Sequence, residues 1–360
     1  MAATDRASND KAGKLLAMEA RQQAELPHEA GWQFEPKWDG FRCLAIRDGD
    51  KVEMLSRSGK TLARYFPDMV EALKALKPRR FILDGELAIP VGKILSFDAL
   101  QLRLHPAASR VNKLAAETPS ILIVFDLLQT PRGVDLIGKP LRERRRALEA
   151  FFASLGEAPA FRLSPATSSR AEAERWLKHA GGGELDGVIA KRLDEPYRAG
   201  ERAMIKVKSL RTADCVVGGF RYATNSRLVG SLLLGLFNEE GKLDHVGFTS
   251  GISDAQRPAL TAKVERLKGG PGFTGDAPGG PRRWSTERSS EWEPLKLKLV
   301  AEVQYDHASG DRFRHGTKFV RWRPDKRPQD CTFDQLRQEA RPSRLFVTKK
   351  RRTSARRAAL

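Results

Sequence analysis

The chain changes its hydrophobic pattern once, close to Lys208, and this change limits the possible folds more than any other feature. From residue 31 to about 209, apolar runs typical of strands alternate with amphipathic stretches typical of helices. The pattern predicts strands at 42–47, 52–56, 81–89, 121–128 and 185–191. It predicts helices at 62–76 with an interruption near Pro67, at 140–152, and from the capping box at Ser169 to the glycines at 181–183. Such a mixture indicates an α+β fold.

After Lys208, short β-like runs are separated by glycine and polar turns. They occupy residues 214–223, 231–238, 243–250, 299–306 and 318–324, with one helix expected at 253–267. About five strands and a single helix are typical of an OB-fold barrel. The glycine-rich stretch 269–282 is expected to be a loop inside this barrel, because strands follow it. Residues 1–30 are polar, with a weak helical pattern at 13–27.

The chain has 360 residues and a net charge of +19. This length suits two domains, and the charge favours a polyanionic partner, most simply nucleic acid. Cys43, Cys215 and Cys331 are far apart and include no C-x-x-C pair, which fits a reducing cytoplasm and argues against structural zinc. No apolar run approaches 18 residues and the N-terminus is polar, so neither a membrane span nor a signal peptide is expected.

The sequence Lys37-Trp38-Asp39-Gly40 lies where a strand should meet a turn. An amine attacks phosphorus only when it is unprotonated, so a nucleophilic lysine needs surroundings that favour its neutral form. In extended backbone Lys37 and Asp39 share a face, and Gly40 allows close approach to the main chain. Taken alone, these residues favour a surface strand end that carries a salt bridge.

Further motifs follow along the chain in a fixed order. They are FILDGEL (81–87) with Asp84 and Glu86, ILIVFDLL (121–128) with Phe125 and Asp126, ELDGVIAKR (184–192) with Asp186 and Lys191, MIKVKS (204–209) with Lys206 and Lys208, and WRPDK (322–326). In this order the series resembles the covalent nucleotidyltransferase superfamily, which contains ATP-dependent DNA ligases, RNA ligases and mRNA capping enzymes. The likeness runs from about residue 31 to about 335 and is greatest to the compact bacterial ATP-dependent DNA ligases of the C and D types.

The resemblance implies an architecture. An ATP-grasp-like adenylation (nucleotidyltransferase) domain would occupy residues 31–209, followed by a C-terminal OB-fold β-barrel at 210–340. The polar segment 1–30 precedes them. The tail 341–360 carries eight basic residues and no acid. It is expected to be disordered and to add DNA affinity through counterion release.

The resemblance also implies three chemical steps. Lys37 attacks the α-phosphate of ATP, which releases pyrophosphate and leaves a lysyl-adenylate. AMP then passes to the 5′-phosphate of a nick, and the 3′-hydroxyl attacks that activated phosphate to close the strand. Each step is an in-line displacement at phosphorus, so positioning and charge neutralisation carry most of the catalysis.

Twelve further positions match nucleotide-binding positions of the family. They are Glu35, Asp39, Gly40, Arg42, Arg57, Glu86, Phe125, Lys206, Lys208, Arg323, Asp325 and Lys326. The resemblance assigns base stacking to Phe125, which by its local sequence would be plain core, ribose contact to Arg42, and the DNA 5′-phosphate to Arg57.

Charged residues nearer the C-terminus match positions that handle the phosphates of ATP. Lys206 and Lys208 would face the α-phosphate, although an isolated K-x-K is usually an exposed strand face. The WRPDK residues would orient pyrophosphate in the first step.

Glu86 and Asp186 are the expected carboxylates for Mg²⁺ or Mn²⁺, and Mg²⁺ usually takes only one or two protein ligands. The family normally has glutamate before the glycine of this motif, whereas here Asp186 precedes Gly187. Aspartate reaches roughly 1.5 Å less far, one C–C bond. A water between Asp186 and the metal, or help from Glu184, would compensate.

The leading interpretation is an ATP-dependent DNA ligase that seals nicked duplex DNA in bacterial repair, as a cytoplasmic, nucleoid-associated monomer without membrane contact. A Ku-like end binder or a repair polymerase is a possible partner. One alternative is an RNA ligase or a GTP-dependent capping enzyme. Another is a non-catalytic OB-fold protein that binds nucleic acid.

Overall fold

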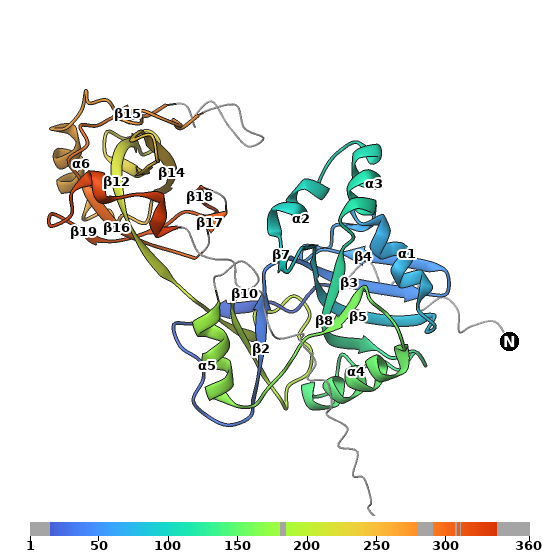
Figure 1. Cartoon of the computed structure of the whole chain (residues 1–360). Coiled ribbons are helices and arrows are strands. Elements are labelled where there is room, and N and C mark those ends of the chain that lie inside the picture. Colours follow the sequence, from blue (N-terminus) through green and yellow to red (C-terminus); the bar gives the residue numbers. More distant parts are fainter. Residues whose placement is uncertain (1–14, 181–184, 280–290, 307, 310, 337–360) are drawn as a thin grey trace, which may run out of the picture. The chain divides into compact units, whose positions relative to one another are not determined.

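The structure is a computed structural model, and it describes residues 15–180, 185–279, 291–306, 308–309 and 311–336. The chain forms two compact units (Figure 1). The first unit ends at Val207 and the second begins at Lys208, where the hydrophobic pattern of the sequence changes.

The first unit contains two main sheets. One has the order β4-β3-β5-β8-β9 and the other β1-β11-β10-β2. The first sheet is formed by β3 (Phe41–Asp48), β4 (Lys51–Leu55), β5 (Arg80–Ala88), β8 (Ile121–Gln129) and β9 (Phe161–Leu163). The second is formed by β1 (Ala20–Gln22), β2 (Trp32–Trp38), β10 (Leu185–Arg192) and β11 (Met204–Lys208). A short hairpin joins β6 (Pro90–Val91) to β7 (Ile94–Leu95).

Helices cover both sheets (Figure 1). They are η2 (Ala63–Tyr65), α1 (Pro67–Ala75), α2 (Phe97–Arg103), α3 (Ala108–Glu117), α4 (Leu141–Leu155) and α5 (Arg170–His179). Among them, α3 packs on α1, α2 and η2. Met69 and Leu73 of α1 and Leu148 and Phe151 of α4 enter one core with the apolar residues of β5 and β8. α5 packs on β2 and β10 through Trp176, which explains why these strands are apolar.

The strands and helices expected in this half of the sequence are confirmed. The interruption near Pro67 is real, because η2 ends at Tyr65 and Pro67 begins α1, where a missing N–H costs nothing. Ser169 caps α5 by accepting a hydrogen bond from Glu172 N at 3.4 Å. The helix ends at His179, and the glycines expected to end it lie outside the described residues.

The helix considered for residues 13–27 is wrong for the described part, 15–27. Ala17, Met18 and Leu26 are buried, and Ala20–Gln22 forms β1, which runs parallel to β11. Glu19 N donates to Glu201 O at 2.7 Å, and Met204 N donates to Glu19 O at 3.1 Å. Pairing with a distant strand satisfies the backbone here, and a local pattern cannot reveal that partner.

The second unit is built on one mainly antiparallel sheet with the order β14-β13-β12-β16-β19, and β15 also pairs with β12. These strands are β12 (Arg211–Tyr222), β13 (Val229–Phe237), β14 (Leu243–Thr249), β15 (Glu293–Pro294), β16 (Val300–Tyr305) and β19 (Lys318–Trp322). Smaller elements are α6 (Arg257–Glu265), β17 (Ala308–Ser309), β18 (Arg312–Phe313), η3 (Pro328–Asp330) and η4 (Phe333–Gln335). The five expected strands and the expected helix are confirmed.

The two edge strands of this sheet come together at one point. Thr249 at the end of β14 forms a parallel bridge with Thr317, which precedes β19. Thr317 N donates to Phe248 O at 3.0 Å, and Thr249 Oγ1 donates to Thr317 O at 2.9 Å. The described part of the expected loop, 269–279, contains neither helix nor strand, and its Phe273 is buried in the core of this unit.

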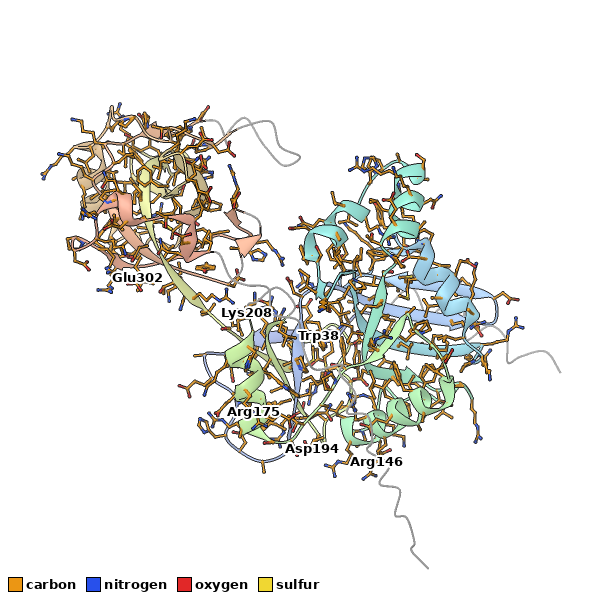
Figure 2. The ribbon with its side chains drawn as sticks, viewed as in Figure 1. Trp38, Arg146, Arg175, Asp194, Lys208 and Glu302 are labelled. Atoms are coloured by element: carbon orange, nitrogen blue, oxygen red, sulfur yellow. The ribbon has the colours of Figure 1, made fainter. Side chains whose placement is uncertain are left out.

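Within the described ranges, no helix has the length and apolar character that a membrane span requires. Exposed arginines such as Arg146 of α4 and Arg175 of α5 extend from the first unit (Figure 2). Their exposure agrees with the large positive charge of the chain.

Candidate active site

Lys37 and Asp186 meet at an irregularity between two paired strands. Trp38 of β2 pairs with Leu185 of β10, and Lys37 pairs with Gly187, so Asp186 is the extra residue of a β-bulge. A bulge re-aims the side chain that it inserts. Lys37 Nζ consequently lies 2.7 Å from Asp186 Oδ2, in an ion pair that is largely shielded from solvent.

Gly40 connects the two sheets of the first unit, because it lies between β2 and β3. A Cβ built on Gly40 would lie 2.2 Å from Leu87 O and 2.7 Å from Glu86 Cγ, both on β5. Glycine is therefore required here by the close approach of two strands. The same approach brings the end of β2, with Lys37 and Asp39, beside Glu86.

Glu86 lies on β5 opposite Arg42 of β3. Burial raises the pKa of Glu86 to about 7, and the charges of Lys37 and Arg42 oppose this while Asp39 adds to it. Glu86 and Asp186 are thus two carboxylates on different sheets that both interact electrostatically with the Lys37 amine.

Arg42 is held by a buried aspartate. Its Nε and Nη2 donate to the two carboxylate oxygens of Asp84 at 2.5 and 2.6 Å. Burial disfavours the charge on Arg42, but the Asp84 carboxylate outweighs burial and raises the pKa of Arg42 above its ordinary value. The guanidinium lies 4.5 Å from the centre of the Phe125 ring.

Phe125 is 8% exposed and lies on β8. The ammonium of Lys191 is also close to it, 4.6 Å from the ring centre. Lys191 Nζ forms an ion pair with Glu35 Oε2 at 2.8 Å, and Glu35 Oε1 accepts a hydrogen bond from Gln33 Nε2 at 2.7 Å. Both charged groups are almost fully buried, at 4% and 2% exposure.

Lys191 and Gln33 were not assigned a role from the sequence. The available signal was a lysine inside an apolar strand, since buried lysines are rare unless they are paired. The structure brings Lys37, Glu35, Glu86, Arg42 and Phe125 together with Asp39, Gly40 and Asp186.

Arg57 and Lys206 are two further expected nucleotide-binding residues of the first unit. The side chain of Arg57 is 72% exposed, with its Nε 3.9 Å from Glu19 Oε1. Lys206 lies on β11 opposite Gln22 of β1. Glu184, considered as a helper of Asp186, lies outside the described residues.

The remaining expected residues belong to the second unit, and they contact other residues of that unit. Lys208 Nζ lies 2.6 Å from Asp306 Oδ2. Arg323 donates from Nη1 to both carboxylate oxygens of Asp214 at 2.9 and 3.0 Å, and from Nη2 to Asp325 Oδ2 at 2.8 Å. The hydrogen bonds from Arg323 lower the pKa of Asp325 to about 2. Lys326 N donates to Arg323 O at 3.2 Å, which closes a turn.

The described residues contain no group of three or more His, Cys, Asp or Glu side chains arranged to hold a metal ion. This finding leaves open a site with two carboxylates. Glu86 and Asp186 supply the hard oxygen atoms that Mg²⁺ prefers, in the small number that it usually takes from protein. The donor chemistry of this pair therefore fits a magnesium ion.

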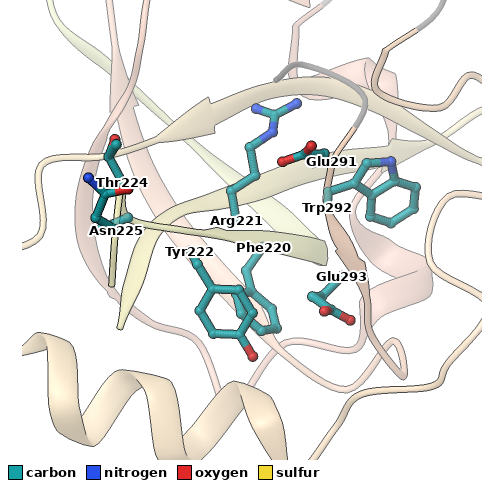
Figure 3. A pocket seen from close by; sticks show the side chains of 9 residues that line it. Phe220, Arg221, Tyr222, Thr224, Asn225, Glu291, Trp292 and Glu293 are labelled. Carbon is teal, nitrogen blue, oxygen red and sulfur yellow. The ribbon is translucent and has the colours of Figure 1, made fainter. Parts of the chain in front are cut away.

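The second unit also has a cavity of about 580 Å³ (Figure 3). It is lined by the end of β12 and the following turn, Phe220 to Asn225, and by Glu291 to Glu293. Figure 3 shows Arg221 and Glu291 on one side and Tyr222 over Phe220 on another. None of the motif residues lines this cavity, so it is distinct from the site around Lys37.

Comparisons with known proteins agree with this geometry. A family model described as the ATP dependent DNA ligase domain matches residues 15–208, and one for the ATP dependent DNA ligase C terminal region matches residues 225–326. DNA ligase C2 of Mycolicibacterium smegmatis is 44% identical over 321 residues, covering 85% of this chain and 90% of that protein. DNA ligase C of Mycobacterium tuberculosis is 42% identical over 334 residues, covering 89% and 92%.

A solved structure from work on Lig E DNA ligases supports the fold alone. It is 18% identical, with a TM-score of 0.54, and the match covers 86% of this chain and 100% of that one. The family models and the relatives above 40% identity cover most of the chain, with Lys37 inside the matched region. The chain therefore belongs to the family of ATP-dependent DNA ligases.

Proposed function

We propose that this ATP-dependent DNA ligase seals nicks between a 5′-phosphate and a 3′-hydroxyl in duplex DNA, through AMP carried first on Lys37 and then on the DNA. The observation that carries the proposal is the ion pair between Lys37 Nζ and Asp186 Oδ2 at 2.7 Å, at a bulge between two strands. An amine at the end of a strand that is paired with Asp186 and interacts electrostatically with Glu86 is held in one orientation. Fixed orientation is what an in-line displacement at phosphorus requires.

In the first step the Lys37 amine forms the N–P bond to the α-phosphate while the bond to pyrophosphate breaks. The ammonium must lose a proton first, and the Asp186 carboxylate lies within hydrogen-bond distance of it. Glu86 and Asp186 would hold Mg²⁺ or Mn²⁺, and such an ion neutralises charge on phosphate oxygens. Lys206 and Lys208 would add positive charge at the α-phosphate.

The adenosine is assigned to the surface around Phe125. A flat ring with Arg42 and Lys191 beside it supports stacking of a purine, since aromatic and cationic groups both attract a π-face. Glu35, Asp39 and Gly40 complete the nucleotide site, and Arg42 would contact the ribose. Arg57 is exposed and is assigned to the 5′-phosphate of DNA.

The first unit would be the adenylation domain and the second an OB-fold. The bridge between Thr249 and Thr317 supports the OB-fold, because it links the edge strands of a sheet that would otherwise stay open. Arg323, Asp325 and Lys326 would orient pyrophosphate in the first step. The guanidinium of Arg323, held by two carboxylates, supports a role for a fixed positive charge.

The substrate is nicked duplex DNA, which the net charge of +19 supports. A role in bacterial DNA repair, with a Ku-like end binder or a repair polymerase, is part of the proposal, as is action on the nucleoid. The enzyme would work as a monomer.

A pulse and chase with α-labelled ATP tests the proposal. The protein is first stripped of bound AMP and labelled in Mg²⁺, and part is denatured to detect covalent label. The rest is then given nicked DNA without free ATP. We expect label on the protein that moves to DNA and yields a sealed strand.

Other outcomes are equally informative. Label that leaves only for nicked RNA would replace the DNA substrate with RNA, and stronger labelling by GTP would indicate a capping enzyme. An unlabelled protein that still binds DNA would reduce the function to nucleic-acid binding.

A further inference from the structure

Tyr197 is a buried tyrosine close to the proposed nucleotide site that no motif included. It lies between β10 and β11 and is 3% exposed. Its hydroxyl donates to Asp84 Oδ2 at 2.7 Å and accepts a hydrogen bond from Met18 N at 2.8 Å. Burial raises the pKa of Tyr197 well above its ordinary value, so the group remains a hydroxyl that can donate to Asp84.

Asp84 is the link between Tyr197 and Arg42. Its side chain is fully buried, and its two oxygens also accept hydrogen bonds from Arg42 Nε and Nη2. A buried carboxylate keeps one geometry only when its lone pairs are occupied. The Tyr197 hydroxyl occupies one of them, and the paired N–H groups of Arg42 fix the plane of the guanidinium.

The N-terminal segment completes this arrangement. Met18 gives its N–H to Tyr197, and its carbonyl accepts a longer hydrogen bond from Arg42 Nη2 at 3.4 Å. Gly200 N donates to Ala17 O at 3.3 Å, and Arg198 N lies 3.3 Å from Met18 Sδ. The loop that carries Tyr197 and the segment that carries Met18 therefore hold each other against the Arg42–Asp84 pair.

We propose that Tyr197 is a positioning residue for ATP, whose hydroxyl acts through Asp84 to fix Arg42 beside Phe125, where the adenosine binds. The inference rests on the proposed function, in which Arg42 contacts the ribose. Tyr197 touches neither ATP nor Lys37 in this account. Its effect appears in how well the adenosine part of the substrate is recognised, because Arg42 is the group through which loss of the hydroxyl reaches the nucleotide site.

The test is Tyr197→Phe in the full chain, with Tyr305→Phe as a matched control. Tyr305 is a similarly buried tyrosine of the second unit, packed on Phe313 with ring centroids 4.8 Å apart. Rates of enzyme adenylation are measured against ATP and 2′-deoxyATP. We expect Tyr197→Phe to raise KM for ATP about tenfold, the size of one lost hydrogen bond to a charged group, with a small change in kcat.

The ratio of kcat/KM for ATP to that for 2′-deoxyATP separates positioning from a merely structural role. We expect Tyr197→Phe to reduce this ratio toward one and Tyr305→Phe to leave it unchanged. Thermal melting accompanies both variants. An unchanged ratio in a folded Tyr197→Phe protein would overturn the inference, because lost stability alone weakens both nucleotides equally.

A double-mutant cycle with Arg42→Lys gives a second test, since lysine keeps the charge but cannot pair with Asp84 through two N–H groups. If Tyr197 acts through Arg42, adding Tyr197→Phe to Arg42→Lys changes KM for ATP by less than about twofold. A repeated tenfold loss would overturn the inference. So would an Arg42→Lys variant with unchanged KM, although covalent labelling by ATP would then still support the proposed function.

Discussion

Lys37 Nζ and Asp186 Oδ2 lie 2.7 Å apart although their residues are separated by 149 positions in the chain. The contact depends on the register of β2 and β10, in which Asp186 is the inserted residue of a bulge. Aspartate is shorter than the glutamate expected at this position, and it still contacts Lys37, the proposed nucleophile. The bulge turns the Asp186 side chain toward Lys37.

Lys37→Ala should abolish covalent labelling by ATP, because Lys37 supplies the attacking amine in the proposed mechanism. Binding to nicked DNA should stay within about threefold of wild type, since many phosphate contacts contribute to it. A gel assay of denatured protein measures the label, and a filter or anisotropy assay measures binding. Residual covalent AMP in this variant would exclude Lys37 as the nucleophile.

Asp186→Asn should slow enzyme adenylation on the order of 100-fold, the size typical for loss of a group that moves a proton or neutralises charge in the transition state. Asp186→Glu keeps the carboxylate and the residue usual in the family, so it should retain most of the activity. Single-turnover labelling over a range of Mg²⁺ concentrations compares the two. Equal activity of the Asn variant and wild type would remove Asp186 from the mechanism.

Glu86 should make stability depend on pH. Burial raises its pKa from 4.5 to about 7 in the folded protein, so the folded state binds the proton more tightly than the unfolded state does. Ionisation of Glu86 therefore lowers the free energy of unfolding. This loss is absent below about pH 4.5, grows as pH rises, and is greatest above pH 7. Glu86→Gln should consequently raise Tm by a few degrees at pH 8 in EDTA, and by less at pH 5.

The exposed Glu157 provides the control for this measurement, since Glu157→Gln should change Tm little at either pH. Melting curves at the two pH values, without metal, suffice. A Glu86→Gln effect that is the same at pH 5 and pH 8 would contradict a raised pKa for this carboxyl.

Arg323→Ala should impair the first step roughly 10- to 100-fold, as expected for loss of a fixed positive charge near a developing anion. Closure of a pre-adenylated nick should change far less, because pyrophosphate takes no part in it. We expect Lys326→Ala to impair the first step and spare this closure in the same way. Arg321→Ala is the matched control, since Arg321 is on the neighbouring strand β19 but is exposed and paired with Glu302. Equal losses in both assays would contradict an orienting role in the first step.

Deleting residues 345–360 should weaken DNA binding and flatten its dependence on salt. The deletion removes six basic residues, and each phosphate contact contributes about 0.9 to the slope of log K against log salt. Titrations between low and physiological salt measure the slope. An unchanged slope would show that this stretch makes no phosphate contact.

The sequence predicted the secondary structure well where local physics decides it. Pro67 can start a helix but cannot continue one, Ser169 caps a helix, and β12 and β13 are too apolar for exposure, so their positions could be inferred. The helix expected from the weak pattern at 13–27 is wrong for the described part, because β1 forms only through its pairing with β11.

For the active site, the sequence by itself determined the chemical groups. The ordered motifs that contain Lys37, Glu86, Phe125 and Asp186 resemble those of ATP-dependent DNA ligases, and the family models confirm that family. Tertiary structure alone decided which groups touch. The bulge at Asp186, the strand crossing at Gly40, and the chain from Tyr197 through Asp84 to Arg42 all depend on pairing between residues far apart in sequence, which no local pattern specifies.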